Sequence, residues 1–132
     1  MDNAFKYIRD KGIATNETYP YQARNLDCKA SVPRAQKISG YVDVPGCDNM
    51  LNALAGRPIA TAADASTWFD YESGILTNCK NNPNHGIFLV GATNDYWKLK
   101  NSWGGDWGEK GYIIIGRGNS CGICNQGSYP IL

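Results

Sequence analysis

The chain has 132 residues, a formal net charge of +1 and 42% apolar residues, which suits one domain of modest size with a real core. Lys and Arg are scattered along the sequence, so charge gives no case for nucleic-acid binding. No apolar run approaches the roughly 20 residues of a membrane span. The first ten residues are typical of an amphipathic helix rather than a signal peptide. We therefore expect either an intracellular chain or a true N-terminus outside this sequence.

Five cysteines, Cys28, Cys47, Cys79, Cys121 and Cys124, are many for a chain of this size and indicate an oxidising compartment. Because the number is odd, at least one has no partner within the chain. A free thiol is one explanation, and a partner on a segment outside this sequence is another.

Apolar spacing predicts a helix over residues 2–11 that Gly12 ends, followed by a loop over 15–34. The next expected elements are a strand over 40–45, a short helix capped by Asp48 and ended by Gly56, a buried strand over 58–63, a helical turn over 66–71, strands over 86–93, 96–101 and 111–117, and an extended tail. A helix followed by mostly antiparallel strands predicts an α+β fold, with a small sheet or barrel over residues 41–128.

The single histidine, His85, lies where an apolar, strand-like run begins, and Asn101 closes the next such run. If the two strands form a hairpin that turns at residues 94–95, His85 and Asn101 meet at one end of it. Histidine exchanges protons near neutral pH, and an amide oxygen on one ring nitrogen would fix its tautomer. Each residue alone has an ordinary structural interpretation, His85 as a packed or surface residue and Asn101 as a turn residue. Together they resemble two thirds of a nucleophile–His–amide triad.

A loop rich in glycine and tryptophan follows Asn101, with Trp103 and Trp107 four residues apart. Flat aromatic faces on a tight loop suit an extended peptide, and carbohydrate stacking would use similar parts. A carbohydrate-binding module is therefore one alternative function. Cys121 and Cys124 also mimic a redox or zinc-binding CxxC pair, but no helix start accompanies them.

These motifs together resemble the papain family of cysteine peptidases, in its cathepsin L-like branch. The resemblance rests on Asn84-His85-Gly86, on Lys100-Asn101-Ser102-Trp103-Gly104, on Trp107-Gly108-Glu109 and Gly111-Tyr112, and on Met1-Asp2-Asn3-Ala4-Phe5, Tyr19-Pro20-Tyr21, Cys121-Gly122-Ile123 and Tyr129-Pro130. It covers the whole chain. It implies a papain-like α+β fold with a partial helical left domain over residues 1–40, an antiparallel β-barrel right domain over 41–128 and an extended tail over 129–132.

The resemblance also implies roles for individual residues. His85 would be the catalytic imidazole, Asn101 its orienting amide and Trp103 the ring that shields them. Trp107 matches the aromatic residue that flanks the leaving-group side. The remaining matches concern substrate: Asn84 binds its backbone through a carbonyl, and the pocket for the second residue before the scissile bond is lined by Met1, Ala62, Gly86 and Gln126. Gln126 is larger and more polar than the usual small residue at that position.

The resemblance implies a disulfide between Cys79 and Cys121, and it matches Cys28 to a half-cystine whose partner lies in a segment outside this sequence. Cys47 and Cys124 have no counterparts, and the sequence leaves their pairing open.

The family's nucleophilic cysteine and oxyanion-hole glutamine lie in an N-terminal segment whose motifs do not occur here. We therefore expect the C-terminal two-thirds of a cysteine endopeptidase, inactive unless another segment completes it. That segment, or another chain, would cover residues 1–35. The alternative is a non-enzymatic binding or structural subunit derived from such a peptidase. We expect a peptide or protein substrate, no cofactor, no metal, no nucleic acid and no membrane span, and a lysosomal, vacuolar or secreted location.

Overall fold

The computed structural model describes all 132 residues. The chain divides into two compact units, a larger one of Met1 and Asp43–Tyr129 and a smaller one of Asp2–Val42 and Pro130–Leu132. In chain order the elements are α1 (Asp2–Lys11), β1 (Gly40–Asp43), α2 (Cys47–Leu54), β2 (Ile59–Ala63), β3 (Ile75–Leu76), β4 (His85–Ala92), β5 (Tyr96–Lys100), β6 (Tyr112–Gly116), the 3₁₀ turn η1 (Ser120–Gly122) and β7 (Gly127–Ile131). The predicted α+β class is confirmed. No helix is both long and apolar enough to cross a membrane.

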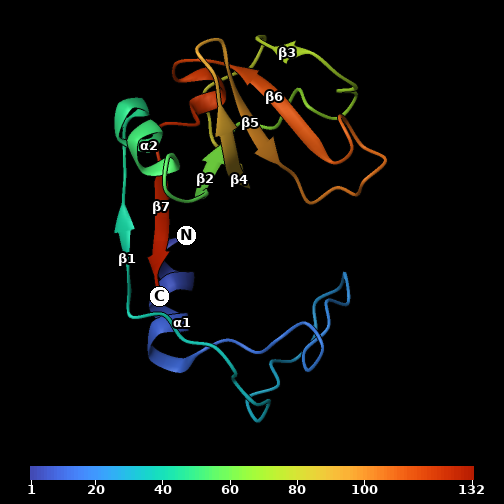
Figure 1. Cartoon of the computed structure of the whole chain (residues 1–132). Helices are drawn as coiled ribbons and strands as arrows, with labels where there is room; N and C mark the ends of the chain where they lie inside the picture. The colour runs from blue at the N-terminus through green and yellow to red at the C-terminus, as the bar shows by residue number, and fades with distance from the viewer. The chain divides into compact units, whose positions relative to one another are not determined.

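The larger unit is built on a sheet with the strand order β7-β2-β4-β5-β6-β3. Strands β2, β4, β5 and β6 lie side by side in Figure 1, each antiparallel to its neighbour. The short β3, which sequence analysis did not predict, runs parallel to β6. The register between β4 and β5 shifts between Leu89 and Gly91, so the hairpin carries a bulge.

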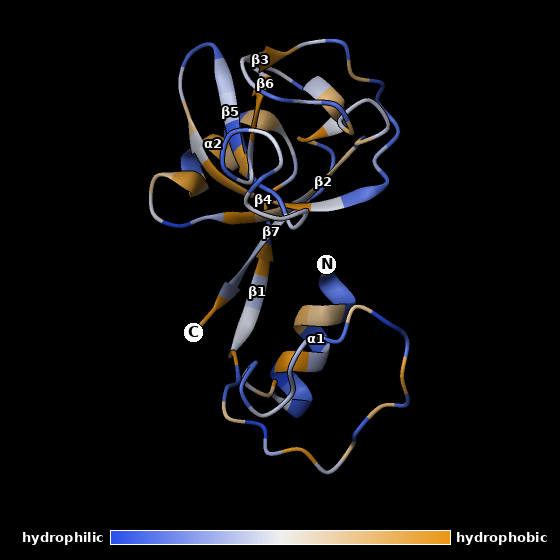
Figure 2. Cartoon of the chain, turned by 90° about the vertical axis from the view of Figure 1, so that its right-hand side faces the viewer, coloured by the Kyte–Doolittle hydropathy of each residue, from blue (hydrophilic) through white to orange (hydrophobic).

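The core of the larger unit is built from the strands of this sheet. Alternate residues of β2 are buried, as the period of two in a strand requires, while β6 is buried almost throughout. Figure 2 shows hydrophobic residues on the strands of this unit and hydrophilic residues on several of its loops. The largest fully buried apolar side chains are Trp68, Trp97, Met50, Ile59, Leu89, Leu99, Ile113, Ile115 and Ile123.

Helix α2 begins differently from the prediction. The residue that caps it is Gly46, with φ 93° and ψ 142°, and no side chain caps it by a hydrogen bond, so the expected Asp48 cap is wrong. The glycine carbonyl accepts a hydrogen bond from the Met50 N–H at 3.0 Å, which starts the helix one residue before Asp48. Asp48 therefore lies within the first turn, where its charge favours the positive end of the helix dipole.

The smaller unit holds α1, the loop that follows it, and β1. Helix α1 ends at Gly12, whose φ of +79° and close approach to the Gln36 carbonyl leave no room for a side chain. None of the helix residues is fully buried, although the Phe5 ring stacks on Tyr41 with a centroid separation of 5.7 Å. β1 lies next to β7 in the strand order, and near this edge the Ser39 N–H donates to the Ile131 carbonyl at 2.8 Å.

Candidate active site

His85 is the first residue of β4, and its backbone is paired with Ala63 at the end of β2. Phe88 pairs with Lys100, the residue before Asn101, so the hairpin register brings the two site residues to the same end of the sheet. His85 Nε2 lies 2.9 Å from Asn101 Oδ1, within a partly buried site. The sheet thus holds the imidazole and the amide in direct contact.

The hydrogen-bond pattern of Asn101 decides the tautomer of His85. The Ser102 backbone N–H donates to Asn101 Oδ1 at 2.8 Å, so this atom must be the amide oxygen, which only accepts. The same oxygen therefore accepts from His85, and Nε2 carries a proton. The neutral imidazole then has its lone pair on Nδ1, where it is free to take a proton from a reacting group.

Aromatic side chains surround the imidazole on two sides. The ring centroid of Trp103 lies 5.2 Å from that of His85, and the ring centroid of Trp68 lies 6.1 Å from it with an interplanar angle of 88°. Trp68 is fully buried, whereas Trp103 keeps 37% of its surface exposed. The two rings restrict the orientation of His85 and reduce the access of water to its bond with Asn101, which strengthens that bond.

A second group of aromatic contacts supports Trp103. Its ring lies 4.9 Å from that of Trp107, edge to face, and Trp107 in turn lies 5.6 Å from Tyr71. The Trp107 indole N–H donates to the Phe69 carbonyl at 3.2 Å, which joins the two loops that carry these rings. Burial raises the pKa of the Tyr71 hydroxyl, which donates to the Gly74 carbonyl and accepts the Ile114 N–H.

Gly108 allows these loops to approach closely. Its φ is +56°, and a Cβ atom there would lie 2.7 Å from the Tyr112 carbonyl oxygen and 3.0 Å from the Tyr71 ring. Any other residue would push the tryptophan loop away from Tyr71.

The buried carboxylate of Asp64 joins the loop after β2 to the segment that precedes His85. Asp64 follows Ala63, and its two oxygens accept the Ser66 N–H and hydroxyl and the Asn82 N–H. These bonds, that of the Ser66 hydroxyl above all, hold the pKa of Asp64 below its usual range. Asn84 completes the connection, since its side chain accepts the Ala65 N–H and its own N–H donates to the Ala63 carbonyl.

A groove of about 360 Å³ is lined by residues that include Asn101 and Gly86. Of the four residues expected in one pocket, the structure brings Met1 and Gly86 to this groove, while Ala62 and Gln126 are not among the residues that line it. Ala62 pairs directly with Gly86 across β2 and β4. Gln126 lies just before β7, with its side chain exposed and its carbonyl accepting the Thr61 hydroxyl.

Four of the five cysteines form disulfides, Cys47 with Cys124 and Cys79 with Cys121. Cys47 and Cys124, whose pairing the sequence left open, therefore bond to each other. Cys28 is free and exposed, and it belongs to the smaller unit. The larger unit therefore contains no thiol that could act with His85. No group of three or more His, Cys, Asp or Glu side chains is placed to hold a metal ion.

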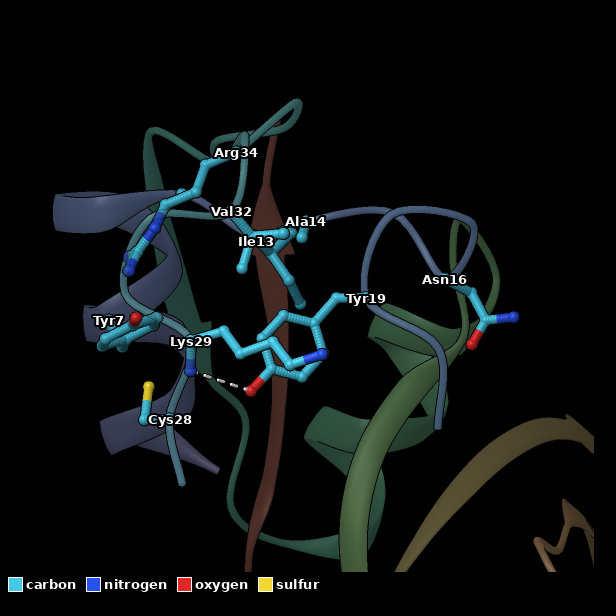
Figure 3. A pocket seen from close by; sticks show the side chains of 10 residues that line it. Tyr7, Ile13, Ala14, Asn16, Tyr19, Cys28, Lys29, Val32 and Arg34 are labelled. Carbon is cyan, nitrogen blue, oxygen red and sulfur yellow. Dashed lines mark hydrogen bonds between the residues drawn. The ribbon is translucent and has the colours of Figure 1, made fainter. Parts of the chain in front are cut away.

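Cys28 lines a separate pocket of about 450 Å³ within the smaller unit (Figure 3). The Lys29 N–H donates to the Tyr19 hydroxyl there at 3.2 Å, and the Arg34 guanidinium lies over the Tyr7 ring. None of the predicted site residues lines this pocket.

Trp68 and Phe69 lie at the site, although they are not among the residues predicted for it. Both lie in the segment predicted as a brief helical turn, which forms two successive turns closed by the Trp68 and Tyr71 N–H groups. The only signal was two adjacent aromatic residues in a polar loop, and nothing in their spacing related them to His85.

Comparison with known proteins identifies the family of this chain. The family model described as papain family cysteine protease matches residues 1–131. Cathepsin L 2 of Paramecium tetraurelia is 45% identical over 134 residues, and vignain of Ricinus communis is 42% identical over 149 residues. The match covers 100% of this chain and 43% of the Paramecium protein, and 99% of this chain and 41% of the Ricinus protein. The chain thus spans less than half the length of these relatives.

Solved structures give the same result for the fold. The cysteine protease CMS1MS2 of Carica candamarcensis, in complex with E-64, superposes with a TM-score of 0.91 at 31% identity over 98% of this chain and 67% of that one. Digestive procathepsin L 3 of Tenebrio molitor gives 0.89 at 39% identity, covering all of this chain and 48% of that one. The expected papain-like fold is therefore confirmed, and the chain belongs to the papain family of cysteine proteases.

Proposed function

We propose that this chain supplies the acid–base half of a cysteine endopeptidase, with His85 as general base and acid and Asn101 as the residue that positions it. The observation that carries the proposal is the 2.9 Å contact between His85 Nε2 and Asn101 Oδ1. The second hydrogen bond, from Ser102, fixes which amide atom faces the ring.

The tautomer determines the proton path. A cysteine thiol gives its proton to His85 Nδ1, and the sulfur attacks the peptide carbonyl carbon. When the tetrahedral intermediate collapses, the C–N bond breaks and the proton moves from Nδ1 to the leaving amine. Water then attacks the thioester with His85 again as base, which releases the carboxylic acid and restores the thiol. Asn101 holds the ring throughout without adding a charge.

The thiol comes from outside these 132 residues, either from another segment of the same polypeptide or from a second chain. In support, the larger unit has no free cysteine, and the four half-cystines cannot form a thiolate. The same external segment covers residues 1–35, where Cys28 is the cysteine left to bond with it.

The substrate is an extended peptide that crosses the site between the Gly86 groove and the aromatic residues. Met1, Ala62, Gly86 and Gln126 act on the second residue before the scissile bond, and the Asn84 carbonyl binds the peptide backbone. The aromatic pair Trp103 and Trp107 lies on the leaving-group side. Two disulfides and the cathepsin-type relatives favour a lysosomal, vacuolar or secreted location.

A second candidate function is a non-enzymatic binding subunit, which the missing thiol in the larger unit favours. Under that function the groove and the aromatic residues hold a peptide, and His85 transfers no proton.

Turnover of a dipeptidyl fluorogenic amide separates the two candidates. We expect none from the chain alone, and measurable hydrolysis once it is joined to the part of the Paramecium cathepsin L 2 that lies outside the match. His85→Ala should reduce that hydrolysis to background, whereas Leu51→Ala, at an exposed side chain of α2 away from the site, should leave it unchanged. Hydrolysis by the chain alone, or hydrolysis that survives His85→Ala, would refute the proposed mechanism.

A further inference from the structure

Asn16 lies in a sequence motif that the peptidase chemistry does not use. Asn16, Glu17 and Thr18 fit the Asn-X-Ser/Thr pattern of N-linked glycosylation, in which X is any residue except proline. No other asparagine of the chain is followed by Ser or Thr two positions later. A three-residue pattern also occurs by chance, so the surroundings of Asn16 decide whether it is a site.

The side chain of Asn16 is exposed, and its amide nitrogen is free. The residue lies in the loop after α1, in a turn closed by two hydrogen bonds between Thr15 and Thr18. Asn16 Oδ1 accepts the Tyr21 N–H at 3.4 Å, whereas Nδ2, the atom that would carry a sugar, donates to no group of the chain. Figure 3 shows the amide pointing away from the other residues around the pocket. A glycan on Nδ2 would therefore extend into solvent without breaking a hydrogen bond.

An apolar surface that the chain leaves open lies beside Asn16. The Tyr21 ring is 87% exposed, and Leu26 is 55% exposed. Both residues line a hollow of about 280 Å³ that Asn16 also lines. The hydrogen bond from the Tyr21 N–H to the Asn16 side chain keeps this ring close to the amide. Flat aromatic faces suit the packing of a sugar, so a glycan on Asn16 would cover apolar surface that water otherwise contacts.

The cysteines fit the compartment in which N-linked glycans are added. Both disulfides of the chain need an oxidising environment such as the lumen of the endoplasmic reticulum, where glycan transfer also takes place. Figure 3 shows Cys28, the residue proposed to bond with the external segment, on the opposite side of the Tyr19 ring from Asn16. A glycan on Asn16 therefore leaves the side of the pocket that carries Cys28 open to that segment.

We propose that Asn16 carries an N-linked glycan and that the first sugar of this glycan packs on the Tyr21 ring. The donor is an oligosaccharide on a polyprenyl diphosphate. A bond forms between Asn16 Nδ2 and C1 of the first sugar, the bond between C1 and the diphosphate oxygen breaks, the amide loses one proton and the polyprenyl diphosphate leaves. Glycosylation rests on the proposed function only for passage through a secretory compartment, and it needs neither His85 nor the external thiol.

Expression of the complete chain behind a signal peptide in a eukaryotic cell line tests the modification. Secreted and retained chains are analysed together, because glycans are added before folding ends and removal of the signal peptide shows that a chain has entered the lumen. The intact mass should exceed that of the polypeptide by one oligosaccharide. Peptide N-glycosidase should remove the difference and convert the modified asparagine to aspartate.

Variants locate the glycan. Asn16→Gln and Thr18→Ala should abolish the mass difference, whereas Thr18→Ser, which keeps the hydroxyl of the motif, should retain it. Asn25→Gln is the matched control, at an exposed asparagine of the same loop outside the motif, and should also retain it. A processed chain of unmodified mass, or a glycan that survives Asn16→Gln, would overturn the proposal.

A separate measurement tests where the sugar lies. In the glycosylated chain we expect nuclear Overhauser contacts between the first sugar and the Tyr21 ring, together with upfield ring-current shifts of the sugar protons. Tyr21→Ala should remove these shifts and leave the mass difference unchanged. Sugar protons without contacts or shifts in the native chain would overturn the packing on Tyr21.

The outcome is distinct from that of the proposed function. An unmodified Asn16 in an active joined protein would refute the glycan and leave the role of His85 standing. A glycosylated chain whose joined form has no peptidase activity would do the reverse.

Discussion

Asn101→Ala should change the tautomer of His85. In the native chain the Nε2 proton is held by a single neutral hydrogen bond of 2.9 Å, and the Ser102 N–H that shares the same oxygen can turn to water because it is exposed. One such bond contributes about 0.5–1.5 kcal/mol, and 1.4 kcal/mol corresponds to a tenfold change in a population ratio. The ratio of the Nε2–H to the Nδ1–H form should therefore fall about 2- to 13-fold.

Long-range ¹H–¹⁵N NMR spectra of the imidazole measure this ratio directly, because the two ring nitrogens of each tautomer have distinct shifts. Asn81→Ala is the matched control, since Asn81 is an exposed asparagine that accepts one side-chain hydrogen bond from Asn125 and does not contact His85. An unchanged tautomer ratio in Asn101→Ala, or an equal change in the control, would refute the argument that Asn101 positions the imidazole.

Three further predictions concern the framework of the site. Gly108→Ala should destabilise the chain by about 1–3 kcal/mol in chemical denaturation, because its Cβ meets the Tyr112 carbonyl, whereas Gly105→Ala, with open space around it, should cost much less. Asp64→Asn should make the stability of the chain less dependent on pH in acid. Hydrogen bonds lower the pKa of this carboxyl in the folded chain, so the stability that they contribute is present above about pH 4 and is lost as the pH falls through the folded pKa. Thermal melts from pH 2 to 7 should show the variant less stable than the native chain near neutral pH, and the difference should shrink at the acid end. Replacing Cys47 and Cys124 together by alanine should cost about 2–4 kcal/mol, since the bond closes a loop of 77 residues, and equal unfolding midpoints for the two proteins would contradict this.

The sequence was sufficient to predict the parts of the site that depend on strand periodicity. Alternation along the two strands of the hairpin placed His85 and Asn101 at one end, and the register of Phe88 with Lys100 agrees with that placement. The bulge after Leu89 was not predictable, because it depends on how the strands twist in the assembled sheet.

The missed parts depend on contacts between segments far apart in the chain. Phe69 and Trp107 are joined by one hydrogen bond across 38 residues, which no local pattern could reveal. Trp68 is buried against His85 for the same reason. The prediction of the α2 cap was wrong for a different reason. Asp48 has the right chemistry for a cap, but the helix begins at Cys47, after Gly46, so Asp48 lies inside its first turn.

Reactivity of the nucleophilic thiol in the joined protein tests the central claim most directly. An ordinary cysteine has a pKa of about 8.5, and a neighbouring imidazolium lowers it. If His85 takes the thiol proton at Nδ1, alkylation by iodoacetamide should proceed well below pH 7 in the joined protein and shift to a profile centred near the ordinary value in His85→Ala. The same alkylation profile in both proteins would contradict the role assigned to His85.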